Sequence, residues 1–276
     1  MSLSLIIGSR ASFLAKIQTF IVKQELKKKI KSIKITTKYH STKGDKNQGH
    51  APWKNLGYGI FTTSLTKGLI NKHFNCVVHS YKDLPILKSK TDYITITRDD
   101  PRDLLLIKKK SINKKNLIIG TSSPRRKSSV RDLKDLIGVK NIKTKTIRGN
   151  VTTRLLKVTL KNQYDAVFMA KAAIDRIFKY GNKVDKVETK KFINLFKKFK
   201  PFILPLSIFP TAASQGAIAI EYLKNDKKTK SILNKINCKK TQSICNQERS
   251  LLKKYGGGCG LDIGITIEEI KNNNFL

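Results

Sequence analysis

Short apolar runs alternate with stretches of helical spacing along the first hundred residues. The run Ser4–Gly8 ends at a glycine, and apolar side chains then recur at helical spacing over Phe13–Val22. Further along, Ile33–Tyr39 has the alternation of a strand, Phe61–His73 has the spacing of a helix, and Cys76–His79 is typical of a buried strand. Because strands alternate with helices, the pattern predicts an α/β fold whose sheet is mostly parallel.

The second hundred residues repeat this pattern. Each predicted strand is followed by a loop and a predicted helix, in the pairs Leu117–Gly120 with Lys127–Leu136, Ile142–Ile147 with Val151–Lys161, and Asp165–Met169 with Ala170–Tyr180. Two such stretches predict two similar α/β domains rather than one long sheet. Phe202–Gln215 contains two prolines and is predicted to cross back between the domains.

The C-terminal part of the chain has a different pattern. Two predicted helices, Lys227–Ile236 and Gln242–Tyr255, are followed by the glycine-rich run Gly256–Gly260. One strand-like run, Ile263–Ile267, comes after them. This order predicts a small third domain.

Charge narrows the class of partner. The 276 residues carry 57 Lys+Arg against 19 Asp+Glu, a net charge of +38, which leaves nucleic acid, an anionic membrane or a polyanionic small molecule as candidates. Only ten of the cations are arginine, and lysine is spread along every segment without interleaved aromatics, a pattern that disfavours nucleic-acid binding. We interpret the surplus charge as surface lysine.

The sequence lacks the motifs that are typical of several kinds of catalytic or binding site. The four cysteines and four histidines have no zinc-ligand spacing, and neither a dinucleotide fingerprint, a phosphate-binding loop nor a hydrolase elbow is found. So few cysteines predict reduced thiols in a cytoplasm. No apolar run of about eighteen residues and no signal-peptide pattern is present, so we expect a soluble, unexported protein without a metal.

Five of the ten arginines lie at equivalent places. Each follows a predicted strand, in the loop or in the first helical turn, and together they are Arg10, Arg125, Arg126, Arg148 and Arg154. Such loops gather at the carboxyl edge of a sheet, where helix N-termini favour anions. Hydroxyls of Thr121, Ser122 and Ser123 join the same edge. This pattern predicts a site for a carboxylate or phosphate ligand.

Two further residues are candidates for chemistry. Asp83 ends a predicted buried strand beside Lys82, where a carboxylate in a basic site can stabilise a developing cation. Cys259 is flanked by glycines, which leave room for another group beside the sulfur. A Lys–Asp pair in a surface turn and an ordinary cysteine in a flexible turn remain the alternatives.

Taken together, these motifs resemble the porphobilinogen deaminase (hydroxymethylbilane synthase) family. The resemblance extends to about Gly264 and rests on nine motifs in the family's order: Gly8–Ser12 with Gln18, Thr42–Asp45, Val78–Pro85, Asp100–Asp103, Gly120–Arg126, Arg148–Val151 with Arg154, Tyr164–Ala166, Gln215–Ala217 and Gly257–Cys259.

The resemblance implies a fold and an activity. The fold is α/β, with two similar periplasmic-binding-protein-like domains, residues 1–98 with about 213–232 and residues 99–212, plus a small, shortened α+β third domain at 233–276. The activity is that of a monomeric transferase of haem biosynthesis. It condenses four porphobilinogen molecules head to tail, loses ammonia each time and releases hydroxymethylbilane. A carboxylate-binding two-domain protein without chemistry is the alternative.

The resemblance also implies residue roles. The primer is a dipyrromethane cofactor held covalently by a thioether to Cys259. Asp83, with Lys82, is catalytic and stabilises the cationic azafulvene left when ammonia departs. Cofactor-binding positions are Ser80, Lys82, Thr121, Ser122, Ser123, Arg125, Arg126, Arg148 and Asn150. Substrate-binding positions are Arg10, Ser12, Gln18, Lys54 and Arg154.

Overall fold

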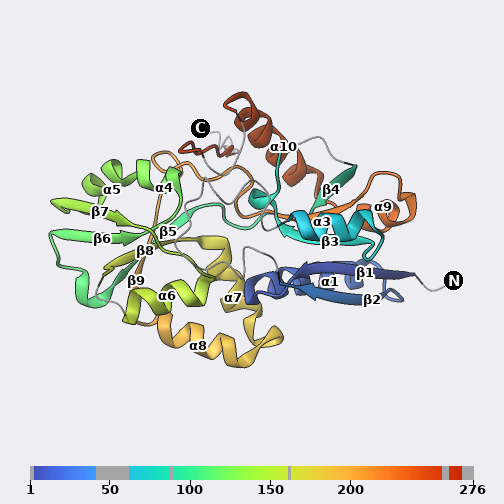
Figure 1. Cartoon of the computed structure of the whole chain (residues 1–276), viewed down its shortest axis with the longest axis horizontal. Helices are drawn as coiled ribbons and strands as arrows, with labels where there is room; N and C mark the ends of the chain where they lie inside the picture. Colours follow the sequence, from blue (N-terminus) through green and yellow to red (C-terminus); the bar gives the residue numbers. More distant parts are fainter. Residues whose placement is uncertain (1–2, 42–61, 87–89, 161–162, 257–260, 269–276) are drawn as a thin grey trace, which may run out of the picture.

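Two five-stranded sheets organise the chain. The computed structural model describes residues 3–41, 62–86, 90–160, 163–256 and 261–268. The strands are β1 (Ser4–Arg10), β2 (Lys34–His40), β3 (Cys76–Ser80), β4 (Thr91–Thr95), β5 (Asp103–Lys108), β6 (Asn116–Gly120), β7 (Asn141–Lys145), β8 (Ala166–Ala170), β9 (Phe199–Ile203) and β10 (Ile218–Leu223). Their orders are β2-β1-β3-β10-β4 and β7-β6-β8-β5-β9, and the two sheets lie at opposite ends of the molecule (Figure 1). The predicted pair of similar α/β units is confirmed.

Helices accompany both sheets. They are α1 (Phe13–Lys29), α3 (Thr63–Ile70), α4 (Pro124–Ser128), α5 (Val130–Ile137), α6 (Val151–Leu160), α7 (Lys171–Val184), α8 (Lys186–Phe196), α9 (Lys227–Asn234) and α10 (Lys239–Lys254). The single helix expected over Lys127–Leu136 is divided at Ser129, which ends α4 and begins α5. No described helix is long and apolar enough to cross a membrane.

The prediction of mostly parallel sheets is confirmed, because four of the five strands in each sheet run in the same direction, but one strand of each sheet is reversed. Strands β2, β1 and β3 pair in parallel, as do β7, β6 and β8, but β10 and β5 each run antiparallel to both of their neighbours. Both of these strands enter their sheet from a connection to the other sheet. Apolar runs predict burial but not strand direction, so the sequence pattern did not show this reversal.

Two connecting segments join the sheets. The chain leaves the first sheet between β4 and β5 and returns to it between β9 and β10. The predicted crossing at Phe202–Gln215 is therefore present, although its start belongs to edge strand β9. The segments touch at Gly216, whose φ of 88° brings its backbone against the carbonyl of Asp99. A side chain at this glycine would collide with that carbonyl.

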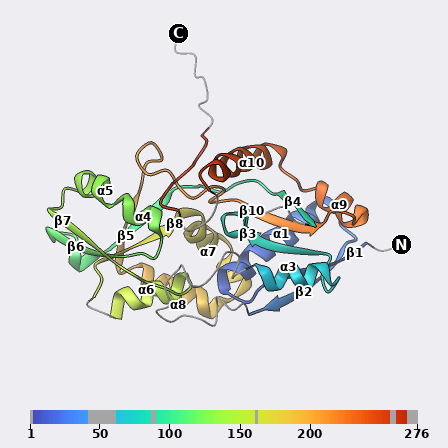
Figure 2. The same ribbon diagram turned by 45° about the horizontal axis from the view of Figure 1, so that its top comes forward.

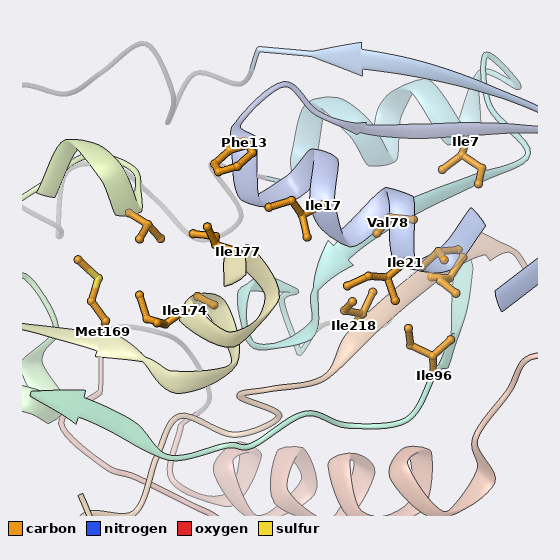
Figure 3. Close-up of a cluster of buried hydrophobic side chains, with 14 of the residues drawn as sticks. Ile7, Phe13, Ile17, Ile21, Val78, Ile96, Met169, Ile174, Ile177 and Ile218 are labelled. Atoms are coloured by element: carbon orange, nitrogen blue, oxygen red, sulfur yellow. The ribbon is translucent and has the colours of Figure 1, made fainter. Parts of the chain in front are cut away.

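Helices α1 and α7 connect the cores of the two sheets. Phe13 and Ile17 of α1 face Ile174 and Ile177 of α7 within one buried apolar cluster, which Figure 3 shows. The cluster continues into both sheets, through residues such as Val78. This shared core fixes the first-sheet loops next to the second-sheet loops, and so positions the candidate site.

The strand expected at Ile263–Ile267 is not formed. The segment instead docks on the chain entering β10, where Ile265 N–H donates to Thr211 O at 2.8 Å and Thr211 N–H donates to Thr266 Oγ1 at 2.8 Å. Helix α10 lies along one side of the molecule, beside β4 (Figure 2). After α9, the described part of the C-terminal region is therefore helix α10 and one docked segment.

Candidate active site

Asp83 and Lys82 lie on a single 3-10 turn, Tyr81–Asp83, that directly follows β3. The Tyr81 amide donates to Ala217 O at 3.1 Å, and the guanidinium of Arg249 from α10 lies 4.6 Å from the centre of the Tyr81 ring. Arg249 also donates to the carbonyls of Tyr81 and Leu84. Because the turn is held from both sides, the half-buried side chains of Lys82 and Asp83 start from a rigid backbone.

A buried carboxylate holds the first two arginines of α4. Asp103, the first residue of β5, accepts from Arg125 Nη2 at 2.8 Å and from Arg126 Nε and Nη2 at 3.1 and 2.7 Å. Burial opposes ionisation of Asp103, but the two guanidiniums outweigh it and hold the pKa of this carboxyl well below its usual range. In this structure, both arginines are therefore paired with a carboxylate of the protein.

Gln215 links this cluster to Lys82. Its Nε2 donates to Asp103 Oδ1 at 2.8 Å, and its Oε1 accepts from Lys82 Nζ at 3.0 Å. Burial lowers the pKa of Lys82 to about 8, with Arg126 and Arg125 acting in the same direction and the carboxylates of Asp83 and Asp103 opposing them. The Lys82 amine therefore titrates closer to neutrality than an exposed lysine does.

Arg154 adds a cation that faces the same group of residues. It lies in the first turns of α6, and burial with the charge of Arg126 lowers its pKa to about 10, against the opposing effect of Asp83. Its Nε is buried and has no hydrogen-bond partner among the described residues. Buried donors without a hydrogen-bond partner are uncommon in proteins, and a bound ligand can supply the missing acceptor. Because Arg154 is a cation, we expect that ligand to be an anion.

The remaining predicted site residues are distributed around this cluster. Gln18 Nε2 donates to Ser80 Oγ at 2.8 Å, which fixes the serine at the end of β3. Ser12 and Asn150 line one cavity of about 280 Å³, between the N-termini of α1 and α6. Ser12 makes no capping bond with its side chain, whereas Asn150 Oδ1 accepts from Thr153 N at 2.8 Å and caps α6.

Some polar side chains of the loop after β6 make hydrogen bonds to other groups of the protein. Ser122 Oγ donates to Ile147 O at 2.7 Å, and Thr121 Oγ1 accepts from Ser123 N at 3.2 Å. Arg10 ends β1, and Arg148 lies just before α6. The predictions for Lys54 and Cys259 fall outside the described residues.

The sequence pattern missed three polar residues that organise the site. Asp103 and Gln215 belong to two of the motifs, but the sequence pattern assigns neither of them a role. Arg176, buried on α7, donates to Asp99 Oδ2 at 2.7 Å and to Gly216 O at 2.6 Å, and so clamps the two connecting segments together. The scarcity of acids is the signal that singles out Asp103, because a buried aspartate in so basic a chain requires cationic partners.

Comparison with known proteins identifies the family. The family model described as "Porphobilinogen deaminase, dipyromethane cofactor binding domain" matches residues 5–231. A porphobilinogen deaminase from Nostoc sp. is 33% identical over 98% of this chain and 79% of its own length, and one from Chlorobium phaeovibrioides is 34% identical over 96% and 79%. A probable porphobilinogen deaminase from Picrophilus torridus is 34% identical over 98% of this chain and 86% of its own. With matches of this extent, the chain belongs to the porphobilinogen deaminase family.

Proposed function

We propose that the chain is a transferase that condenses porphobilinogen molecules head to tail with loss of ammonia, and so makes hydroxymethylbilane. The observation that carries this proposal is the placement of Asp83 beside buried cations. This half-buried carboxylate interacts electrostatically with Lys82 and Arg154, and Arg126 interacts with both of these cations. Such a site binds an anionic substrate and also offers one negative charge to a cation formed within it.

The described residues fit a dipyrromethane group with acetate and propionate side chains. Within the described part of the chain, four cationic side chains, Lys82, Arg125, Arg126 and Arg154, interact with two carboxylates, Asp83 and Asp103, so positive charge remains for a ligand. The buried Nε of Arg154, which has no partner among the residues that the structure describes, supplies a donor for such a group. When bound, the dipyrromethane supplies the primer to which substrate rings are joined.

Asp83 is proposed as the catalytic carboxylate. Its place on a turn anchored by Arg249 fixes the backbone from which the carboxylate extends. It accepts hydrogen bonds from pyrrole N–H groups of the substrate and stabilises the positive charge that develops there as ammonia leaves. Preorganised charge of this kind acts without reorganisation at the moment of reaction, and a low-dielectric surrounding strengthens it.

The neighbouring cations bind and orient carboxylates. Arg154, whose buried Nε has no partner among the described residues, suits contact with an acetate or propionate, whereas Arg126 already makes a bidentate contact with Asp103 and holds that carboxylate in place. Lys82 holds a proton at Nζ, and its lowered pKa of about 8 lets it release that proton near the working pH of a cell.

Free thiols at Cys76, Cys238 and Cys245 support a reducing compartment, and we propose the cytoplasm.

Covalent attachment of the primer to Cys259 is the test of the proposal. We expect the intact mass of the purified chain to exceed the sequence mass by one dipyrromethane unit, with peptide mapping placing it within Gly256–Gly260. The Cys259→Ser variant should lose both the adduct and the consumption of porphobilinogen. Cys76→Ser is the matched control, because that thiol is fully buried and burial raises its pKa far above the usual value, so it should carry no adduct.

Two outcomes would contradict the proposal. A folded, unmodified chain that still consumes porphobilinogen would exclude the primed mechanism. A folded, unmodified chain that binds porphobilinogen without consuming it would favour the carboxylate-binding protein instead.

A further inference from the structure

The carboxamide of Gln215 is buried where three parts of the site meet. Its Nε2 donates to Pro101 O and to Asp103 Oδ1, each at 2.8 Å, while its Oε1 accepts from Lys82 Nζ at 3.0 Å. A flipped amide would point its hydrogens at the lysine amine and its oxygen at two acceptors. The environment therefore fixes which end of the amide faces Lys82.

The backbone on either side of Gln215 is also fixed. Arg98 Nε donates to Gln215 O at 2.8 Å, and the preceding residue, Ser214, donates its amide to Glu248 Oε2 at 2.6 Å. Ser214 has a φ of 64°, a left-handed conformation that a non-glycine residue adopts only when its surroundings hold it there. Glu248 lies on α10 and is fully buried, so the C-terminal helix and both connecting segments all hold the glutamine in place.

The charges around Lys82 explain why a neutral partner matters. Asp83 lies next to it in the chain, Asp103 approaches from β5, and Arg125 and Arg126 approach from α4. The two carboxylates raise the pKa of the amine, and the two guanidiniums lower it. Gln215 Oε1 accepts a hydrogen bond from the amine without adding a charge of its own. A carboxylate at this position would raise the pKa of the lysine and so favour its protonated form.

We propose that Gln215 is a positioning residue, whose carboxamide oxygen orients the Lys82 amine beside Asp83 and, being uncharged, leaves that amine able to exchange its proton. The orientation of the amine is a property of the folded chain by itself. Its use in condensation rests on the proposed function. The two parts are therefore tested by separate measurements.

The first measurement is the pH dependence of acylation of Lys82 by acetic anhydride, followed by peptide mass spectrometry on the full chain. Intact mass is recorded on the same samples, so that variants are compared at equal cofactor occupancy. In Gln215→Glu the added carboxylate should raise the labelling midpoint of Lys82 by roughly 1–3 pH units. In Gln215→Leu, which removes the acceptor, the midpoint should fall.

A second lysine–glutamine pair provides a matched control. Lys145 Nζ donates to Gln163 Oε1 at 2.9 Å on the exposed surface. Gln163→Glu should leave the labelling midpoint of Lys82 unchanged and move that of Lys145 only slightly, because water screens the exposed pair. If Gln215→Leu does not fold, Gln215→Glu, which keeps the side-chain size, carries the test.

The second measurement is the pH profile of kcat for porphobilinogen consumption. In Gln215→Glu the limb assigned to Lys82 should move in the same direction as the labelling midpoint, while KM changes less than kcat. Unchanged labelling midpoints in folded Gln215 variants would overturn the positioning role. A shifted midpoint with an unshifted profile in an active enzyme would overturn its part in the reaction. An inactive parent chain whose labelling shifts as expected would contradict the proposed function alone.

Discussion

Removing the charge of Asp103 tests whether the arginine pair depends on it. Asp103→Asn keeps the size of the side chain but leaves the guanidiniums of Arg125 and Arg126, whose side chains are 7% and 10% exposed, without their counter-charge. Both oxygens of Asp103 accept hydrogen bonds, but asparagine has only one acceptor oxygen, so its amide hydrogens must replace the other oxygen and face the donors there. Either orientation therefore breaks at least one of the charge-assisted hydrogen bonds.

The expected loss is large for a single polar substitution. Breaking a buried ion pair by removing one partner costs about 3–5 kcal/mol, and the remaining oxygen places this variant near the lower end of that range. Net folding stabilities of about 5–15 kcal/mol make such a loss easy to measure by urea unfolding followed by circular dichroism. Because the guanidiniums hold the pKa of Asp103 far below its usual value, its contribution is present above about pH 4 and is lost as the pH falls further.

Asp100→Asn is the control for this experiment. Asp100 makes the same kind of contact with Arg102, at 2.6 Å, but the arginine side chain is 40% exposed. Exposed ion pairs contribute about 1 kcal/mol or less, so this variant should unfold close to the parent. Equal losses for the two variants, or a difference between Asp103→Asn and the parent that does not shrink in acid, would refute the argument from buried charge.

Three other substitutions test the site. Asp83→Asn should leave folding intact and slow condensation far more than threefold, a threshold of about 0.65 kcal/mol in the barrier, and activity within threefold would exclude Asp83 from the catalytic role. Arg126→Leu should yield chain largely without cofactor, because it removes the charge-assisted contact of Arg126 with Asp103, worth roughly 1.5–3 kcal/mol, and one cation of the proposed cofactor site. Full cofactor occupancy, measured by intact mass, would contradict this. For Lys82→Met, the stability relative to the parent should fall by about 1.4 kcal/mol per pH unit between about pH 8 and about pH 10.4, because in that range the folded parent has lost the lysine proton that its unfolded chain still binds. A difference in urea unfolding that stays flat over this range would count against the lowered pKa.

The elements that the sequence predicted are those with local signals. The strand-loop-helix units that begin at β1, β6, β7 and β8 each combine an apolar run with a following helical period. Strand β5 is buried throughout, but its apolar run has no helix after it, and edge strand β9 contains Pro201, which weakens its pattern. Strands β5 and β10 are defined by pairing with distant segments, which a local pattern does not report.

The site shows the same division between local and long-range information. Asp83 and the arginines were found because each follows a strand, which places it at a sheet edge. The link from Lys82 to Asp103 runs through Gln215, whose contacts with these two residues join positions more than one hundred apart in the chain.

Those partners change how the cations are interpreted. Arg125 has its two terminal nitrogens on Asp103 and Pro210, at 2.8 and 3.0 Å, and so serves mainly to hold the site together. Arg154, whose buried Nε has no partner in the described part of the chain, and Lys82 are the cations that we expect to face a ligand. The number of arginines at the sheet edge therefore overstates the charge that is available to an anion. Asp103 uses part of that charge to fix the geometry with which the rest is presented.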